Sequence, residues 1–536
     1  MRLFRSLAGA AALFLSVSPA LAAFGVTSSS SALTIDTGAS LVFTINTANG
    51  NLTSLKYGAK ELQDKTKFSH IASGFGRATV SHKTVGEYVV VTSTSTNIGG
   101  EITQYFVAKK GENTIYMATH ATTEPTVGEL RFIARLSKSA LPNGYTVSSV
   151  DGCTAIEGED VFSCSTSSSA KETRSKFYSS RQFVDDQVHG VTGDGVGVWM
   201  VVPGTGYEKS SGGPFYRDID NQGTAQQELY FSYRTGLFGP YALVINEGST
   251  PSASLDTSFF GSLGIKCYYG KDERGYVKGT ASEIAGEYAD YITVGWSDSN
   301  AQYWTRASSS GSFTSPAMIP GTYTQSLYKM ELEVARKSNV VVISGSITSV
   351  ATLLKRSAFS SLFFLTPTAI WSIGSPDGTP RGFLNADKIE TMHPSDSRMA
   401  SWGPVVFDVS SSSSSEWPMA QFKDVNNGNQ IVFELTAAQA EAARTLEVGI
   451  TSSFASGRPQ VTVNSYTGKA PTAPTKVDSR GVTRGTWRGY NTAYKTVVPG
   501  SALVAGQNTA TIEVISGSSG DKFLSPNIIF EYIRFY

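Results

Sequence analysis

Short segments in which apolar and polar side chains alternate occur from one end of this chain to the other. In residues 41–46, for example, Leu41, Phe43 and Ile45 would all lie on one face of an extended strand. Similar segments, bounded by clusters of Gly, Ser, Asn or Pro, lie at residues 88–92, 114–118, 197–202 and 511–514. A helical period occurs only in short pieces such as residues 436–444. We therefore expect an all-β chain built from sandwiches, and not a parallel α/β sheet.

The length of the chain, 536 residues, is too great for one hydrophobic core and predicts several modules. We expect a large β-sandwich over residues 23–270 and a small, seven-stranded sandwich over 271–346. The stretch 311–323 of the second region resembles fibronectin-type or carboxypeptidase-regulatory-like modules. Residues 347–536 show a jelly-roll-like pattern. Aromatic residues of this last region would either stack on sugars or belong to the core: Trp371, Trp402, Trp487 and Tyr490.

Residues 1–22 have the pattern of a secretory signal peptide. Arg2 and Arg5 give a positive start, an apolar stretch follows at 7–17, and Ala20-Leu21-Ala22 is a small-residue cleavage pattern. The apolar stretch is too short to span a bilayer, and no later stretch approaches the ~20 apolar residues that spanning requires. We therefore expect a secreted, extracellular protein with no membrane partner.

Charge and cysteine content limit the partners and the covalent structure. The chain has 44 Lys plus Arg and 44 Asp plus Glu, which argues against a nucleic-acid partner but allows an anionic substrate held by a few local cations. Of the three cysteines, Cys153 and Cys164 are close enough to bridge a hairpin or loop, and Cys267 would be left over. Asn51 begins the single N-glycosylation acceptor pattern, Asn-Leu-Thr.

Eight short motifs are distributed over the chain, at residues 23–26, 128–135, 173–180, 210–215, 256–260, 392–399, 478–485 and 525–527. Together they resemble the fungal rhamnogalacturonan lyases of polysaccharide lyase family 4. The resemblance implies a large catalytic β-sandwich, a fibronectin-type-III-like middle domain and a C-terminal carbohydrate-binding-like jelly roll. It also implies β-elimination at the rhamnosyl-α-1,4-galacturonosyl bond of pectic rhamnogalacturonan I, with no metal or other cofactor. We further expect a monomer.

The resemblance also assigns candidate catalytic residues. Lys176, in the motif Thr-Arg-Ser-Lys-Phe-Tyr-Ser-Ser, matches the family's catalytic lysine, and Arg131 matches the family's arginine. Elimination removes a weakly acidic proton next to a carboxylate, so the enzyme needs a base and a cation that neutralises the carboxylate. Arg131 could serve as that cation and could also lower the pKa of Lys176. Tyr230 matches a family tyrosine and would help to bind the substrate or protonate the leaving group.

One segment departs from the family pattern. The family has a histidine, which contributes to proton transfer, after the strand that carries this tyrosine, and the segment with that histidine is absent between Tyr230 and Gly236. None of the five histidines matches it: His70, His82, His120, His189 and His393. The alternative hypothesis is therefore a catalytically impaired family member that only binds pectin. A third possibility is that the sequence lacks a stretch that the transcript encodes.

Other chemistries find little support in the sequence. Residues 218–223 begin like a calcium loop but lack the later glutamate, and no His/Cys cluster predicts zinc. Asp185 and Asp186 are neighbours, so on a strand they would face opposite ways and make a poor glycosidase pair.

Overall fold

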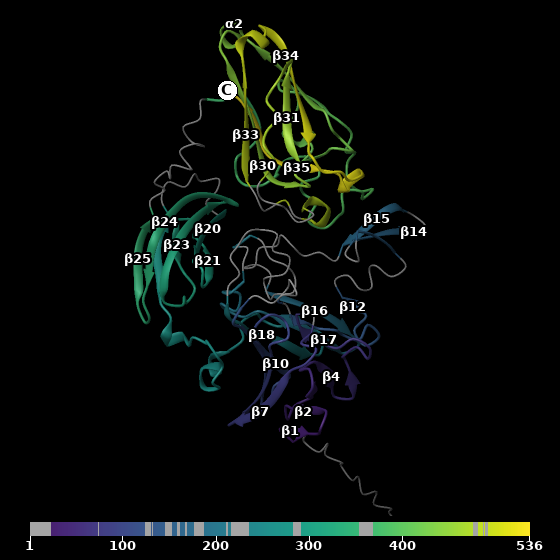
Figure 1. The fold of residues 1–536 in the computed structure, drawn as a ribbon, viewed down its shortest axis with the longest axis vertical. Coiled ribbons are helices and arrows are strands. Elements are labelled where there is room, and N and C mark those ends of the chain that lie inside the picture. The colour runs from purple at the N-terminus through teal and green to yellow at the C-terminus, as the bar shows by residue number, and fades with distance from the viewer. Residues whose placement is uncertain are drawn as a thin grey trace, which may run out of the picture.

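The computed structural model describes residues 23–72, 74–123, 130, 132–144, 153–157, 161–166, 169–175, 187–210, 213–215, 235–281, 291–352, 368–474, 481–485, 487 and 491–536. Strands dominate these residues, in three groups that follow one another along the chain (Figure 1). The one α-helix with bounds in the described part, α2 (Ala437–Ala440), is a single turn. No helix in the described ranges has the length and apolar character needed to cross a membrane. The all-β prediction is confirmed.

The first module is a sandwich of two sheets. The smaller sheet holds five strands in chain order: β1 (Gly25–Ser28), β2 (Ala32–Asp36), β3 (Leu41–Asn46), β4 (Leu52–Tyr57) and β5 (Lys60–Glu61). The larger sheet runs in the order β12 (Asn143–Gly144), β16 (Val188–Gly193), β17 (Val196–Val201), β18 (Gly236–Asn246), β10 (Thr114–Ala121), β9 (Ile102–Lys109), β8 (Tyr88–Ser95) and β7 (Thr79–Val85). Side chains from both sheets, such as Phe43 and Phe106, share one core.

The central strands β9 and β10 of the larger sheet are buried on both faces. The second face of this sheet packs Tyr105 and Tyr116 against Phe259 and Phe260 of a short 3-10 helix, η2 (Ser258–Ser262). All eight residues of β10 are therefore buried. The alternation expected at residues 114–118 does not produce an exposed face there, because the later segment around η2 covers it.

The second module is a small sandwich of seven strands. One sheet runs β22 (Ser312–Thr314), β19 (Tyr276–Ala281) and β25 (Ile347–Thr352), and the other runs β21 (Gln302–Arg306), β20 (Ile292–Ser297), β23 (Gly321–Lys329) and β24 (Leu332–Val342). Trp296, Tyr303 and Tyr323 fill the space between the sheets. Because β25 pairs in parallel with β19, the second module extends through this strand. The boundary that the sequence predicts after residue 346 therefore lies directly before β25.

The third module has the two five-stranded sheets of a jelly roll. One runs β26 (Trp371–Gly374), β35 (Asn527–Phe535), β30 (Arg444–Phe454) and β33 (Thr492–Val498), with β28 (Ala420–Phe422) also paired to β35. The other runs β27 (Val406–Asp408), β29 (Asn429–Leu435), β34 (Gly506–Ile515), β31 (Arg458–Val463) and β32 (Tyr466–Thr467). Trp417 and Phe530 lie between them.

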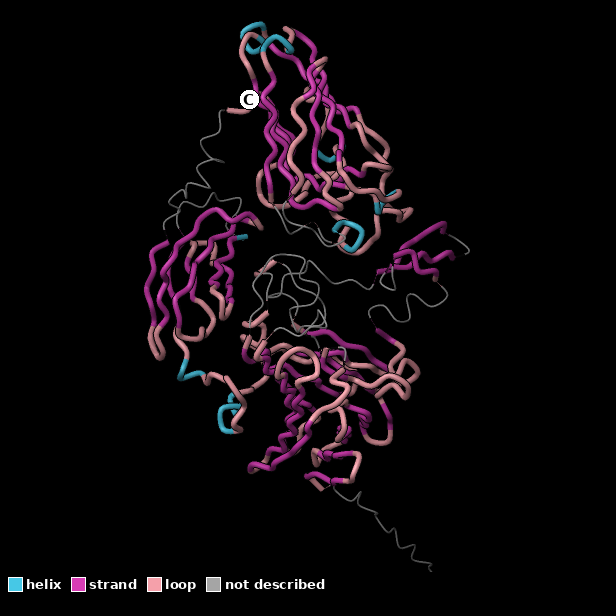
Figure 2. Tube along the Cα trace, in the orientation of Figure 1, coloured by secondary structure: helices cyan, strands magenta, loops and turns pink. Residues whose placement is uncertain are grey.

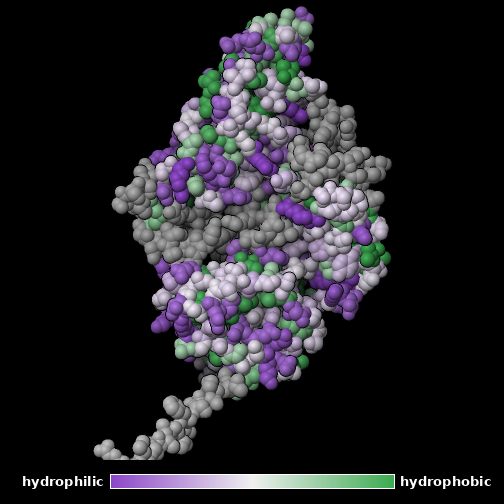
Figure 3. Space-filling model, turned by 180° about the vertical axis from the view of Figure 1, so that it is seen from behind, coloured by the Kyte–Doolittle hydropathy of each residue, from purple (hydrophilic) through white to green (hydrophobic). Residues whose placement is uncertain are grey.

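On the face of the molecule drawn in Figure 3, hydrophilic side chains cover much of the described surface and apolar ones are scattered between them.

A buried ion pair joins the first module to the second. Arg274 donates to both carboxylate oxygens of Glu208, at 2.6 and 3.0 Å, and the Tyr303 hydroxyl donates to the same carboxylate at 2.6 Å. The exposed fractions of the two ionic side chains are only 8% and 5%. Beside them, Tyr207 stacks on Trp304 with 4.1 Å between ring centroids.

Replacing Arg274 by alanine should destabilise the protein by about 3–5 kcal/mol, because Glu208 would remain charged and unpaired in a buried place. Denaturant unfolding followed by tryptophan fluorescence measures this loss. The matched control is Arg336→Ala, which breaks a more exposed pair with Glu333 in the same module and should cost less than about 1 kcal/mol. Equal effects of the two substitutions would contradict the importance of burial.

A second buried carboxylate lies where the third module meets the second. The Asp377 carbonyl accepts hydrogen bonds from the Glu331 and Leu332 amides of the second module, and Gly378 approaches so closely that a Cβ there would lie 2.7 Å from the Leu332 nitrogen. The Gly378 amide donates to Glu531 at 2.7 Å. Burial, with a contribution from the Asp377 charge, raises the pKa of Glu531 to about 7. The fold therefore favours the neutral form of this carboxyl.

The raised pKa of Glu531 predicts the direction in which the stability of the Glu531→Gln variant changes with pH, relative to the wild type. Because the folded pKa of about 7 exceeds the ordinary 4.5, the wild type loses stability as pH rises from 4.5 through 7. Glutamine cannot ionise and still accepts from Gly378, so the variant should gain about 3 kcal/mol relative to the wild type between pH 4.5 and 8. Denaturant unfolding across this range measures the difference, with exposed Glu434→Gln as control. A difference that does not change with pH would refute the assignment.

Candidate functional site

The three candidate catalytic residues, Lys176, Arg131 and Tyr230, lie outside the described residues. Their roles stay predictions, but the described chain beside two of them has a definite environment. Leu130 and Phe132 are both buried in the core of the first module. The Phe132 ring lies 6.2 Å from that of Phe106. The strand that leads into Lys176 ends at Ser175, the residue directly before it.

That strand belongs to a small sheet of three strands, β13 (Thr154–Glu157), β14 (Val161–Thr166) and β15 (Ser169–Ser175). The order β13-β14-β15 leaves β15 at one side of this sheet. Figure 2 shows β14 and β15 between the first and third modules, apart from the large sheets. Among the described side chains of the three strands, Val161, Cys164 and Thr173 are the buried ones.

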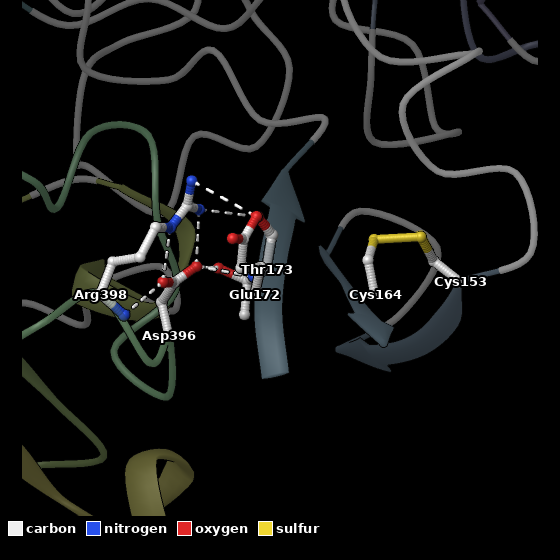
Figure 4. Close-up of a disulfide and its surroundings, with 6 residues drawn as sticks. All are labelled: Cys153, Cys164, Glu172, Thr173, Asp396 and Arg398. Atoms are coloured by element: carbon white, nitrogen blue, oxygen red, sulfur yellow. Dashed lines mark hydrogen bonds and ion pairs between the residues drawn. A yellow bond between two sulfur atoms is a disulfide. The ribbon is translucent and has the colours of Figure 1, made fainter. Parts of the chain in front are cut away.

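A disulfide fixes one side of the small sheet. Cys153 and Cys164 are joined, with an S–S distance of 2.08 Å, as their spacing allowed. Cys164 lies opposite Glu172 in the pairing of β14 with β15 (Figure 4). The bond therefore links the residue directly before β13 to β14, the central strand of this sheet.

The third module fixes the other side. Asp396 accepts hydrogen bonds from the Thr173 amide at 2.6 Å and from the Thr173 hydroxyl at 2.7 Å (Figure 4). The Arg398 guanidinium donates to the same carboxylate at 2.8 and 2.9 Å, and to the Thr173 carbonyl at 3.3 Å. The His393 amide donates to the Thr173 hydroxyl at 3.1 Å. We call these contacts between Thr173 and the loop 393–398 the Asp396 clamp.

The buried negative charge of Asp396 is balanced within the clamp by hydrogen bonds from Arg398 and Thr173. The Asp396 side chain has no exposed surface. Burial opposes its charge, but hydrogen bonds from Arg398 and Thr173 outweigh that effect and hold the pKa of Asp396 well below its usual range. Burial also lowers the pKa of His393 to about 4, so this imidazole is neutral near pH 7. Glu172, 3.7 Å from Arg398, adds a second acidic partner.

The remaining histidines have separate environments. His82 is exposed on β7, His189 lies opposite Met200 at the β16–β17 pair, and His70 is on β6 (His70–Ile71). His120 is buried, with its Nε2 atom 3.5 Å from the thiol sulfur of Cys267, and burial lowers its pKa. Cys267 is a free, exposed thiol.

The other candidate residues are distributed as follows. Asn51 is half-buried in the turn before β4, where its carbonyl accepts from the Asn46 amide, and its glycosylation stays a prediction. Trp371 and Trp402 are core residues, with 7% and 6% exposure, and so do not present a sugar-stacking surface. Trp402 donates to the Pro394 carbonyl and thereby supports the loop of the Asp396 clamp. Within the described ranges, no group of three or more His, Cys, Asp or Glu residues could hold a metal ion.

The Asp396 clamp was not predicted from the sequence. The motifs at 173–180 and 392–399 are separate in the sequence, and the structure joins them through Thr173 and Asp396. The sequence feature that could have indicated the clamp is the Asp-Ser-Arg tripeptide at 396–398. It places an acid and a base two residues apart, outside any helical pattern. No spacing rule connects positions 223 residues apart in sequence.

Comparisons with known proteins agree with this architecture. Three family models match in order: "Rhamnogalacturonan lyase B, N-terminal" over residues 24–267, and "Polysaccharide lyase family 4" domain II over 273–350 and domain III over 369–535. The three matched models thus define the class, a three-module polysaccharide lyase. The chain belongs to polysaccharide lyase family 4.

Relatives match along nearly the whole chain. Rhamnogalacturonate lyase A of Aspergillus aculeatus is 49% identical over 532 residues, which cover 96% of each chain. Rhamnogalacturonate lyase A of Emericella nidulans is 49% identical over 531 residues, again 96% of each chain. A solved xanthan lyase of Paenibacillus aligns with 94% of this chain and 51% of its own, at 8% identity and a TM-score of 0.20, too weak a likeness for any argument.

Removing the disulfide should loosen the small sheet alone. Replacing both Cys153 and Cys164 by alanine should lower its local stability by about 2–3 kcal/mol, because the short closed loop regains conformational freedom when opened. Hydrogen exchange of the β14 and β15 amides measures this change, and the β9 and β10 amides serve as the internal control. Unchanged exchange in β14 would show that the disulfide does not hold the sheet.

Proposed function

We propose that this chain is a secreted rhamnogalacturonan lyase that cleaves the rhamnosyl-α-1,4-galacturonosyl bond of pectic rhamnogalacturonan I by β-elimination. The carrying observation is the match to rhamnogalacturonate lyase A over 96% of both chains, with all three family domains in order. The residues 1–22 and the half-buried Asn51 acceptor support secretion and glycosylation. The protein acts as a monomer in this proposal.

The chemistry requires three groups, and the sequence supplies a residue for each. Arg131 holds the galacturonate carboxylate and offsets the negative charge that builds up as the neighbouring C5–H bond breaks. Lys176 accepts that proton. The electron pair forms the C4–C5 double bond as the C4–O bond breaks. The departing rhamnosyl oxygen then receives a proton from protonated Lys176 or from Tyr230.

Lys176 can act as a base only if its pKa lies well below that of a free lysine. A nearby guanidinium such as that of Arg131 favours the neutral amine, and so does burial. These two residues are therefore a functional pair: the cation that binds the substrate carboxylate also prepares the base.

The test is the near-ultraviolet absorbance of the unsaturated product during incubation with rhamnogalacturonan I. The wild type should produce it, and Lys176→Met should lower the rate by ~10²–10⁴-fold, since methionine keeps the length of the side chain but cannot accept a proton. The control is Lys278→Met, at an exposed position of β19 in the second module, which should leave the rate unchanged.

A wild type without any unsaturated product would contradict the proposal. Measurable affinity for rhamnogalacturonan together with no cleavage would instead favour the pectin-binding alternative that the missing histidine segment raised. Full activity of Lys176→Met would assign the base to another residue.

A further inference from the structure

The Asp396 clamp holds the chain at a point close in sequence to the proposed base, which a contact that only joins two modules would not require. It holds Thr173, and only Arg174 and Ser175 separate this residue from Lys176. We propose that Asp396 and Arg398 of the third module are positioning residues for the proposed base Lys176. The inference rests on the proposed function. It gives the third module a role in the chemistry besides any contact with glycan.

The loop satisfies every polar group of Thr173. Its amide and hydroxyl donate to Asp396, its carbonyl accepts from Arg398, and its hydroxyl also accepts from the His393 amide. An amide and a carbonyl of the same strand residue point to the same side of the strand. The side of β15 away from β14 is therefore bound by one acid and one base in place of another strand.

Asp396 is itself held rigidly. One carboxylate oxygen accepts from the Arg398 amide and Nε, each at 2.9 Å, and the other accepts from Thr173 and from Arg398 Nη2. Five donors on this carboxylate, whose side chain has no exposed surface, favour one orientation. Rotation of the carboxylate would leave buried donors without an acceptor, which is costly.

The clamp and the disulfide act at adjacent positions of the small sheet. Cys164 lies opposite Glu172, and Glu172 is the neighbour of Thr173. The clamp thus holds β15 directly at Thr173, and the disulfide holds the neighbouring strand β14 at Cys164 (Figure 4). From Thr173 to Lys176 the extended chain spans at most ~11 Å between Cα atoms, so the backbone is fixed only three residues before the proposed base.

A proton-transfer residue needs this kind of support. A base must come within roughly 2.6–3.2 Å of its proton, and a misplacement of about 1 Å can cost ~10²-fold in rate. Loss of the clamp should therefore reduce kcat, while KM, which depends on the rest of the substrate groove, should change little.

The first experiment compares Asp396→Asn with the wild type on rhamnogalacturonan I. Asparagine keeps the shape but presents an amide to donors, so kcat should fall by ~30–100-fold with KM within about 3-fold. The matched control is Asp408→Asn in the same module, whose carboxylate accepts only from Ser410 among the hydrogen bonds described, and which should behave like the wild type.

A second pair of variants keeps the test valid if Asp396→Asn does not fold. Thr173→Val removes the hydroxyl that contacts Asp396, and Thr173→Ser retains it. The valine variant should lose ~10-fold in kcat, and the serine variant should stay within about 2-fold of the wild type, as expected for one hydrogen bond that supports orientation.

Substrate binding separates positioning from general damage. In a Lys176→Met background, adding Asp396→Asn should leave the Kd for rhamnogalacturonan oligosaccharides unchanged in calorimetric titration. A Kd weakened more than about 10-fold would indicate a damaged groove and overturn the inference. So would full kcat of both Asp396→Asn and Thr173→Val in an enzyme that Lys176→Met inactivates, although the proposed function would then stand. An inactive wild type would overturn both.

Discussion

Buried carboxylates at the module junctions determine how this chain is assembled. The three β cores consist mainly of their own apolar side chains, although Trp304 of the second module also packs into the first core, and the junctions between them contain Glu208, Asp396 and Glu531. A buried charge is tolerated only with specific partners in specific positions. Apolar contact is non-directional, so these hydrogen-bonded acids restrict the arrangement of the modules more than apolar contact alone would.

The three carboxylates are accommodated by different means. Glu208 has a guanidinium and a phenol as donors, and Asp396 receives two donors from Thr173 and three from Arg398. Glu531 has one amide at short distance and the nearby charge of Asp377, so the fold favours its protonated form. The Asp396 junction differs from the others because it holds a strand that runs directly into the proposed catalytic lysine. The proposed positioning of Lys176 therefore depends on the contact between the third module and this strand.

Much of the fold could be predicted from local pattern, because a strand buried on one face alternates apolar and polar residues. This worked for β3, whose Leu41, Phe43 and Ile45 are all buried. It failed for β10, which is covered on its second face by Phe259 and Phe260, more than a hundred residues later. The aromatic residues Trp371 and Trp402 show the same limit, since buried and exposed rings look alike in sequence. The disulfide was predictable because its two cysteines are only 11 positions apart.

The sequence predicts which residue types form the candidate site, but it does not predict how they are arranged in space. Lys176, Arg131 and Tyr230 follow from motifs, and the described residues leave their arrangement a prediction. The Asp396 clamp could not be foreseen, because nothing local in residues 392–399 indicates a partner at Thr173. It arises from tertiary packing alone.

The identity of the cleavage products tests the central claim most directly. Mass spectrometry of rhamnogalacturonan I fragments released by the wild type should find galacturonosyl ends that are one water lighter than the products of hydrolysis, and Lys176→Met should release almost none. Fragments with saturated galacturonosyl ends, or unsaturated fragments released equally well by Lys176→Met, would contradict a lysine-dependent elimination.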